Sequence, residues 1–383
     1  MVQVNPDNGI TESPGTSRWL STPSELDQWL LGLPLEAPVA LDTEFERVST
    51  FYPIPGLVQL GGAGQLWLVD PEVAAGSDQF RAMLNDPTRP KLLYAMSEDL
   101  ELFRHWLDLE PRGVIDLQVG AALAGAGFSV GYARLVETLF GEVLDKSATR
   151  SDWVSRPLSA QQEKYAIDDI RFLEPVYQWV APRLQERGLS AAMAEESERF
   201  AEEAAAAENP ETHYLKLRGG WGLNPDQQVL LQALVAWRER ECRRVDRPRS
   251  RVINDGLLIA IAERQPESLE ALSDVQGVAP GFVRRYGESL LQLTTAAPEL
   301  DGGDFEFIPR PLTRDQQALY KKVKKHFRNA AESIDIPIEI LAPRKRIEAV
   351  IQSRNLTGSP FFEGWRRQVI APVASDIEEL LRQ

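Results

Sequence analysis

A short apolar segment near the N-terminus turns acidic as it ends, and this pattern limits what can surround it. Residues 38–45 read Pro-Val-Ala-Leu-Asp-Thr-Glu-Phe, which predicts a buried strand. Alternate residues of a strand share a face, so Asp42 and Glu44 point the same way. Two carboxylates beside a core repel each other and are poorly solvated unless a cation joins them. The segment therefore predicts a Mg²⁺ or Mn²⁺ site, although a solvated strand end would carry the same residues.

A further acidic position follows the apolar run 91–96. Ser97, Glu98 and Asp99 open a predicted helix, with Ser97 expected as its N-cap. Acids in the first turn of a helix favour its dipole, so Asp99 has an ordinary structural explanation as well as a functional one. Glu98 is the alternative functional acid, although the spacing of the apolar residues that follow places Asp99 next to the buried face and turns Glu98 outward.

Tyr165 and Asp169 are the last members of this acidic set. They lie four residues apart in a predicted helix over 162–173, so they share one helix face. Two consecutive aspartates disfavour the helix that contains them, which indicates a role other than helix formation. Asp168 is the competing choice, and a solvated acid beside a core tyrosine is the structural alternative.

The order Asp-x-Glu, then Asp, then Tyr-x-x-x-Asp resembles the tyrosine branch of the DEDD superfamily of 3′→5′ exonucleases. The chain looks most like the ribonuclease D family over roughly residues 20–210. The segments that carry this likeness are LDTEF (41–45), FYP (51–53), GLVQL (56–60), SEDLELF (97–103), LDKS (144–147), SDW (151–153) and RPL (156–158).

The resemblance implies an α/β fold: a ribonuclease H-like mixed-sheet exonuclease domain followed by two small all-α helical bundles. It implies that Asp42, Glu44, Asp99 and Asp169 bind two divalent metal ions, Mg²⁺ or Mn²⁺. Tyr165 would position the attacking water, because an ordinary tyrosine pKa near 10 argues against a base at neutral pH. The expected reaction is hydrolysis of RNA from a free 3′ end, releasing nucleoside 5′-monophosphates. The expected substrates are tRNA precursors and other small structured RNAs.

The second half of the chain contains a repeat. Asp226-Gln227-Gln228 recurs as Asp315-Gln316-Gln317, and Asp246-Arg247-Pro248 recurs as Asp335-Ile336-Pro337, each 89 residues later. The first copy, 216–297, resembles the helicase-and-RNase-D-C-terminal (HRDC) domain. The second copy, 309–383, is a diverged likeness in which His326 takes the place of Trp237. We expect a disordered segment at 1–17, an exonuclease domain at 18–210 and these two helical domains.

Charge gives a mixed indication about nucleic acid. The net charge of −15 has the wrong sign for general electrostatic binding of RNA, yet basic residues gather in each helical copy. Each run is either a solvated helix face or a surface that binds the RNA backbone. The arginine run is the stronger candidate for RNA binding. The arginines expected to contact RNA are Arg238, Arg243, Arg244 and Arg247. The lysine run consists of Lys321, Lys322, Lys324, Lys325 and Arg328. Near the acidic set, three aromatic residues would either stack on terminal bases or belong to the core: Phe51, Tyr52 and Trp153.

Composition sets the outer limits. A single cysteine, Cys242, excludes an internal disulfide and suits a reducing cytoplasm. The N-terminal residues lack the apolar segment of a signal peptide, no membrane segment is expected, and no obligate protein partner is indicated. Two rival functions remain at this point. One is a DNA exonuclease of the same superfamily, since no residue can be assigned to the ribose 2′-hydroxyl. The other is a non-catalytic RNA-binding scaffold.

Overall fold

The computed structural model of this chain describes residues 18–296 and 305–382. These residues group into two compact bodies. The first contains residues 18–46, 54–202 and 312–382, and the second contains residues 47–53, 203–296 and 305–311. The segment 1–17, expected to be disordered, lies outside the described residues.

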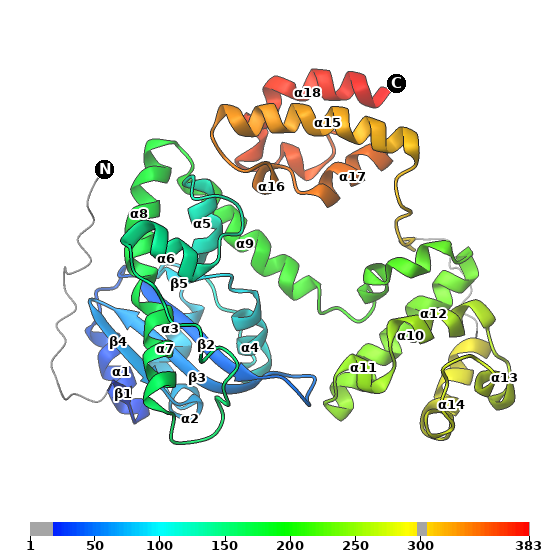
Figure 1. The fold of residues 1–383 in the computed structure, drawn as a ribbon, viewed down its shortest axis with the longest axis horizontal. Helices are drawn as coiled ribbons and strands as arrows, with labels where there is room; N and C mark the ends of the chain where they lie inside the picture. Colours follow the sequence, from blue (N-terminus) through cyan, green and yellow to red (C-terminus); the bar gives the residue numbers. More distant parts are fainter. Residues whose placement is uncertain (1–17, 297–304, 383) are drawn as a thin grey trace. The chain divides into compact units, whose positions relative to one another are not determined.

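Among the described residues, the first body contains one sheet of six strands (Figure 1). In chain order these are β1 (Trp19–Leu20), β2 (Val39–Glu46), β3 (Ile54–Gly62), β4 (Gln65–Val69), β5 (Lys91–Leu93) and β6 (Val114–Asp116). Their spatial order is β1-β4-β3-β2-β5-β6. Strand β3 runs antiparallel to β2 and β4, whereas the other neighbouring strands are parallel. The sheet is therefore mixed, as expected, and the acidic strand β2 lies inside it.

Helices cover both faces of this sheet (Figure 1). On one face, α1 (Pro23–Gly32), α3 (Asp78–Asn85) and α4 (Ser97–Leu107) share a buried cluster with Leu41 of β2. On the other face, α7 (Ala160–Arg171) and α8 (Leu173–Glu186) share clusters with Ala40 of β2 and Leu57 of β3. Because side chains alternate along a strand, Asp42 and Glu44 lie on the face that α7 covers. The remaining helices of this region are α2 (Pro71–Ala75), α5 (Leu117–Leu123), α6 (Tyr132–Phe140) and α9 (Ser190–Ala206).

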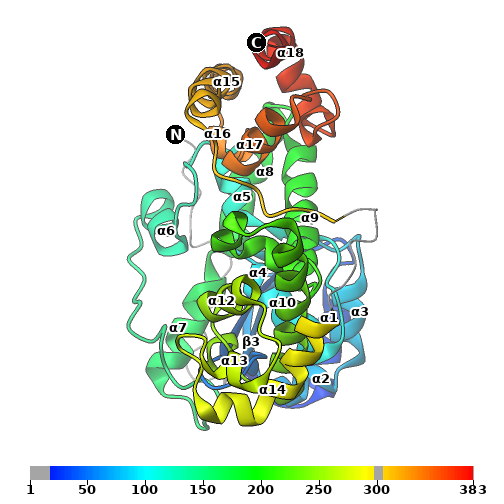
Figure 2. The ribbon, with the colours of Figure 1, turned by 90° about the vertical axis from the view of Figure 1, so that its right-hand side faces the viewer.

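The C-terminal helices are part of the same body as the sheet. They are α15 (Arg314–Ser333), α16 (Ile338–Leu341), α17 (Arg344–Ser353), the short 3-10 helix η3 (Pro360–Phe362) and α18 (Arg366–Arg382). Helix α16 contacts α5, and Figure 2 shows these two helices close together. Val323 and Phe327 of α15 belong to the same buried cluster as Leu117 and Val180. The second repeat copy therefore completes a core that the sheet region begins.

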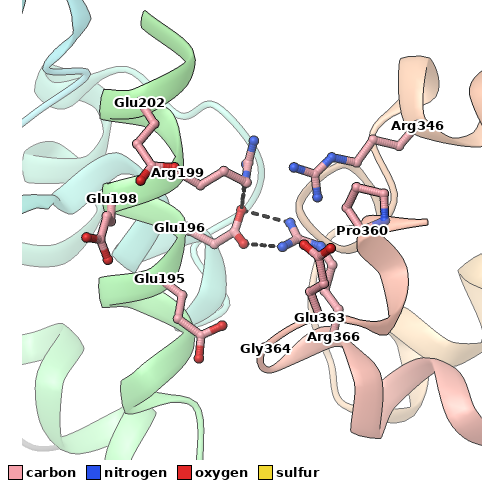
Figure 3. A pocket seen from close by; sticks show the side chains of 10 residues that line it. All are labelled: Glu195, Glu196, Glu198, Arg199, Glu202, Arg346, Pro360, Glu363, Gly364 and Arg366. Atoms are coloured by element: carbon pink, nitrogen blue, oxygen red, sulfur yellow. Dashed lines mark hydrogen bonds and ion pairs between the residues drawn. The ribbon is translucent and has the colours of Figure 1, made fainter. Parts of the chain in front are cut away.

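A buried ionic contact joins α9 to this C-terminal module (Figure 3). Arg366, at the start of α18, donates hydrogen bonds to both carboxylate oxygens of Glu196, one of them 2.8 Å long. Arg199 and the indole N–H of Trp365 also donate to Glu196, at 2.6 Å and 2.9 Å. Burial acts to raise the pKa of Glu196, but the hydrogen bonds and charge of these partners outweigh it, and the net pKa is lowered. The carboxylate is thus held ionised between the two elements.

The second body is helical. It contains the 3-10 helices η1 (His213–Lys216) and η2 (Arg218–Gly222), then α10 (Pro225–Val245), α11 (Arg249–Val252), α12 (Asp255–Arg264), α13 (Leu269–Ser273) and α14 (Pro280–Thr295). Its core includes Leu234 of α10 and Ile261 of α12, together with Phe51. Phe51 comes from the loop that connects β2 to β3, and the backbone N–H groups of Phe51 and Tyr52 donate to the Asp246 carboxylate at 2.9 and 3.0 Å. The tip of this connection is therefore built into the helical core.

The repeat seen in the sequence is also present in the helices. Helices α10, α11 and α12 begin 89 residues before α15, α16 and α17, respectively. Asn224 and Thr313 each form a capping box at the start of the long helix. Asp246 and Asp335 both adopt left-handed backbone conformations, with φ of 47° and 50°. Equivalent residues thus perform equivalent local roles in the two copies.

Candidate active site

Strand β2 and helix α7 bring three acidic side chains together. One carboxylate oxygen each from Asp42, Glu44 and Asp169 lies within 4.8 Å of the other two. Asp42 and Glu44 point the same way because they are two residues apart on β2, and α7 crosses that face with Asp169. A capping box of Ser159 with Gln162 starts α7. Residues more than 120 positions apart in sequence thereby share one site.

Asp99 reaches the same end of β2 from helix α4. Its side chain is buried, with 7% exposed, and its Oδ1 accepts a hydrogen bond of 2.5 Å from the Thr43 hydroxyl. Asp99 is not part of the trio within 4.8 Å, but its charge contributes to the raised pKa of Asp42. Glu98 is exposed, as the apolar spacing predicted. The expectation for Ser97 was wrong: the helix begins at Ser97 itself, and the N-cap position is Met96, which makes no side-chain cap.

Thr43 was not singled out from the sequence. It lies between Asp42 and Glu44, so strand alternation directs it to the opposite face, toward α4. Its hydroxyl holds one oxygen of Asp99 and so fixes the orientation of that carboxylate. The period of two in β2 was available as a signal, but the position of α4 beside Thr43 depends on the tertiary structure.

The geometry separates Asp169 from its neighbour Asp168. Asp168 forms an ion pair of 2.5 Å with Lys164, one turn earlier on α7. Asp169 instead joins the trio, and its carboxylate accepts a hydrogen bond from Tyr165. Of the two consecutive aspartates, only Asp169 therefore faces the acidic site.

Without a cation, these carboxylates are hard to ionise together. Burial, then repulsion from Asp99, Asp169 and Glu44, raises the pKa of Asp42 well above its ordinary value. Burial, followed by the charges of Asp169 and Asp99, raises the pKa of Glu44 to about 9. Burial likewise raises the pKa values of Asp99 and Asp169 to about 7. Hard divalent cations prefer carboxylate oxygens, so this donor set fits Mg²⁺ or Mn²⁺.

Tyr165 stands at the edge of the trio with its hydroxyl in the protonated form. Burial and the charge of Asp169 raise its pKa. Its hydroxyl also accepts a hydrogen bond of 3.3 Å from Thr149, and its ring lies 5.8 Å from the Trp153 ring, centroid to centroid. At neutral pH the Tyr165 hydroxyl is a hydrogen-bond donor and not a base.

Three of the residues predicted to contact RNA are buried, and for these the expectation is corrected. Phe51 is 3% exposed in the helical core. The guanidinium carbons of Arg243 and Arg249 lie 4.7 and 4.9 Å from the centroid of its ring. Trp153 is 2% exposed beside Leu57 and Leu68. Arg238 is 1% exposed and pairs with Glu239 and Asp255. None of these three side chains presents a surface to a polyanion, whereas Tyr52 remains half-exposed.

The two basic runs also differ in how their charge is balanced. On and beside α10, the arginines bind carboxylates: Arg238, Arg243 and Arg249 contact Glu239, Arg240 contacts Glu211 and Arg244 contacts Glu241. Arg247 is exposed. On α15, Lys321, Lys322, Lys325 and Arg328 are exposed, and within the described residues none of them pairs with a carboxylate. Most arginines of the first copy are therefore neutralised, whereas the exposed basic side chains of α15 are not, although the lysine run was the weaker expectation.

Comparisons with known proteins agree with this architecture. Residues 17–185 match a 3′-5′ exonuclease family model, and residues 227–294 match the HRDC domain. The chain is 34% identical to the ribonuclease D of Pseudomonas paraeruginosa over 357 residues, covering 92% of this chain and 94% of that protein. It is 32% identical to the ribonuclease D of Escherichia coli over 345 residues, covering 87% of this chain and 90% of that protein.

A solved structure also matches over most of the chain. The crystal structure of E. coli RNase D, described as an exoribonuclease involved in structured RNA processing, superposes with a TM-score of 0.84. The match covers 95% of this chain and 99% of that one, at 29% sequence identity. Separately, no helix within residues 18–296 and 305–382 is long and apolar enough to cross a membrane.

Proposed function

This chain belongs to the ribonuclease D family and is a 3′→5′ exoribonuclease, and we propose that four of its carboxylates hold two divalent metal ions for that reaction. The proposed ligands are Asp42, Glu44, Asp99 and Asp169. When bound, such ions supply the Lewis acidity that activates water and stabilises the departing oxygen in phosphodiester hydrolysis. The product released from each 3′ end is then a nucleoside 5′-monophosphate.

One observation carries this proposal. Three carboxylate oxygens from β2 and α7 lie within 4.8 Å of one another in a site where burial opposes their ionisation. A protein gains nothing in stability from such a cluster alone, because each added charge repels the others. Divalent cations remove that repulsion, and the ordinary oxygen ligands of Mg²⁺ and Mn²⁺ are the groups present.

Two adjacent pairs of acids provide the test. Asp169→Asn and Asp99→Asn remove proposed ligands, whereas Asp168→Asn and Glu98→Asn remove neighbouring charges outside the site. Mn²⁺ binding is measured by calorimetry, and cleavage is followed on a short single-stranded RNA. Both ligand variants should lose cleavage and bind Mn²⁺ far more weakly, while both controls retain both properties. If Asp169→Asn behaves like Asp168→Asn, and Asp99→Asn like Glu98→Asn, in both Mn²⁺ binding and RNA cleavage, the assignment of the metal ligands is rejected.

The geometry supports a positioning role for Tyr165. Its protonated hydroxyl already donates to Asp169, a proposed ligand, so it lies where it can orient a water molecule at the site. Proton removal from that water does not fall to Tyr165, because the raised pKa makes its phenolate a minor species at neutral pH.

We further propose that RNA contacts the free basic face of α15. Arg314, Lys321, Lys325 and Arg328 recur at helical spacing, share one exposed face and have no carboxylate partner within the described residues. The basic face ends at Glu332, which is acidic. In the first repeat copy, the position equivalent to Lys325 is Ala236, which is buried. This helix surface is therefore buried in the first copy, whereas in the second copy it is exposed and carries basic side chains.

Charge removal on α15 tests this surface. The triple variant Lys321→Gln, Lys325→Gln, Arg328→Gln should weaken RNA binding and flatten its salt dependence, by about 0.7 in log–log slope for each lost contact with single-stranded RNA. The matched control is Arg134→Gln, Arg344→Gln, Arg382→Gln, which removes three exposed charges that each pair with a nearby glutamate. Equal losses of affinity in both triples would indicate a general charge effect and reject the α15 surface.

The finer points of substrate and organisation are part of this proposal. Residues 309–383 would be a second, diverged HRDC domain, which the matched helix starts of the two copies support.

We propose tRNA precursors and other small structured RNAs as substrates. We also propose a cytoplasmic location, consistent with the single buried Cys242. Processing of a 3′-extended tRNA, compared with a short RNA oligonucleotide, separates this substrate class from unstructured RNA.

A further inference from the structure

Strand β3 carries one polar side chain where its neighbours are apolar. Gln59 is fully buried, with 0% exposed, and so are Leu57, Val58 and Leu60 around it. An amide in the centre of a sheet has to satisfy one acceptor and two donor functions, whereas a leucine or methionine would fill the same space without that requirement.

Neither end of this amide has a partner. The Oε1 and Nε2 atoms of Gln59 are both buried and make no hydrogen bond within the described residues. A buried polar group left in this condition costs about 1–3 kcal/mol relative to a satisfied one. Gln59 therefore weakens the metal-free fold, which indicates that its partner belongs to another state of the protein.

Strand pairing shows which groups lie beside Gln59. On β2 its direct partner is Asp42, and on β4 it is Leu68. Directly opposite residues of antiparallel strands share a face and have Cβ atoms about 4.5–5.5 Å apart. The same face carries Leu57, which lies in one cluster with Leu68 and with Ala166 and Ile167 of α7. Gln59 is thus enclosed between the sheet and α7, next to a proposed metal ligand.

We propose that Gln59 is a positioning residue for the metal centre, donating an amide hydrogen bond to the Asp42 carboxylate when that carboxylate binds a cation. This inference rests on the proposed metal site. A ligating carboxylate keeps lone pairs for a second hydrogen bond, and Gln59 is the donor opposite Asp42. Such outer partners hold a ligand in its binding orientation, and their loss weakens metal affinity about 10- to 100-fold.

Two opposite effects of one substitution test the proposal. Gln59→Met replaces the amide with an apolar side chain of similar length. In EDTA this variant should unfold at the same or higher urea concentration than the parent, because the unsatisfied amide is gone. Its affinity for Mn²⁺, measured by calorimetry, should nevertheless fall about 10- to 100-fold. Gln59→Leu, an apolar replacement of different shape, should give the same pair of effects and covers a failure of the Met variant to fold.

The control is Leu57→Met, a conservative apolar change on the same strand and face, opposite Glu44. It should leave Mn²⁺ affinity unchanged within about twofold, because no polar contact is altered. Unchanged Mn²⁺ affinity in the Gln59 variants would overturn the inference, and so would a lower stability in EDTA, which would mean that the amide already has a partner there.

Failure of this inference is distinguishable from failure of the metal site itself. If Asp42→Asn loses Mn²⁺ binding while Gln59→Met keeps it, only the role of Gln59 is rejected. If Asp42→Asn binds Mn²⁺ as the parent does, the proposed metal site is rejected and the Gln59 inference with it.

Discussion

Tyr165 combines a raised pKa with a hydrogen bond to Asp169. We predict that Tyr165→Phe lowers kcat roughly 10²- to 10³-fold, the range observed when one oriented donor is removed from an active site. RNA affinity should hardly change, because the ring and its packing against Trp153 remain. Single-turnover cleavage and equilibrium binding of the same RNA measure the two quantities. A variant as active as the parent would remove Tyr165 from the reaction.

Metal binding should depend on pH in a direction set by Glu44. Its pKa of about 9 in the metal-free protein means that it is protonated at pH 7, and a cation binds only the ionised form. Apparent Mg²⁺ affinity should therefore rise as pH increases from 7 to 9, about tenfold per pH unit for each proton released. Calorimetry in buffers of different ionisation enthalpy counts those protons. An affinity independent of pH over this range contradicts the raised pKa.

At the scale of the element, close packing of β3 on the segment before α7 constrains Gly56. A Cβ added there would lie 2.7 Å from the Trp153 Cβ and 2.8 Å from the Trp153 carbonyl oxygen. Because backbone would have to shift, Gly56→Ala should cost about 1–3 kcal/mol of unfolding free energy. It should also lower activity, since Trp153 packs against Tyr165. Urea unfolding and cleavage assays measure the two effects.

Gly32 at the end of α1 provides the control for that substitution, because nothing lies within 4 Å of a Cβ added there. Gly32→Ala should leave stability unchanged or raise it by about 0.4–1 kcal/mol through the unfolded state. If both alanine variants unfold at the parent urea concentration, β3 and the Trp153 segment are not packed as closely as described.

At the scale of the whole molecule, the contact of Glu196 with Arg366 should determine whether the C-terminal module stays attached to α9. Arg366→Gln leaves a buried carboxylate with fewer partners, and breaking such a pair typically costs about 3–5 kcal/mol. The control Glu198→Gln changes an exposed acid on the same helix. We expect earlier urea unfolding and faster proteolysis of residues 312–382 only in the Arg366 variant. Equal proteolysis of the two variants would show that the apolar core alone holds the module.

Three features were predictable from sequence because they depend on local chemistry. Strand alternation placed Asp42 and Glu44 on one face, helical spacing paired Tyr165 with Asp169, and the matched offset revealed the two helical copies. The ordered motifs also identified the family and the exoribonuclease activity, so the DNA exonuclease and the inactive scaffold are set aside. These inferences needed only the period of an element or the order of residues along the chain.

Other features required the tertiary structure, because they depend on which distant side chains become neighbours. The sequence showed two basic runs, but it did not show that carboxylates neutralise most of the arginines while the exposed lysines of α15 have no carboxylate partner among the described residues. It showed aromatic residues near the acidic motifs but not that Phe51 and Trp153 are buried. Nor did it distinguish Gln59, a single polar residue in an apolar strand, from an ordinary core substitution. Burial and charge balance are properties of the packed chain, so only the fold decides them.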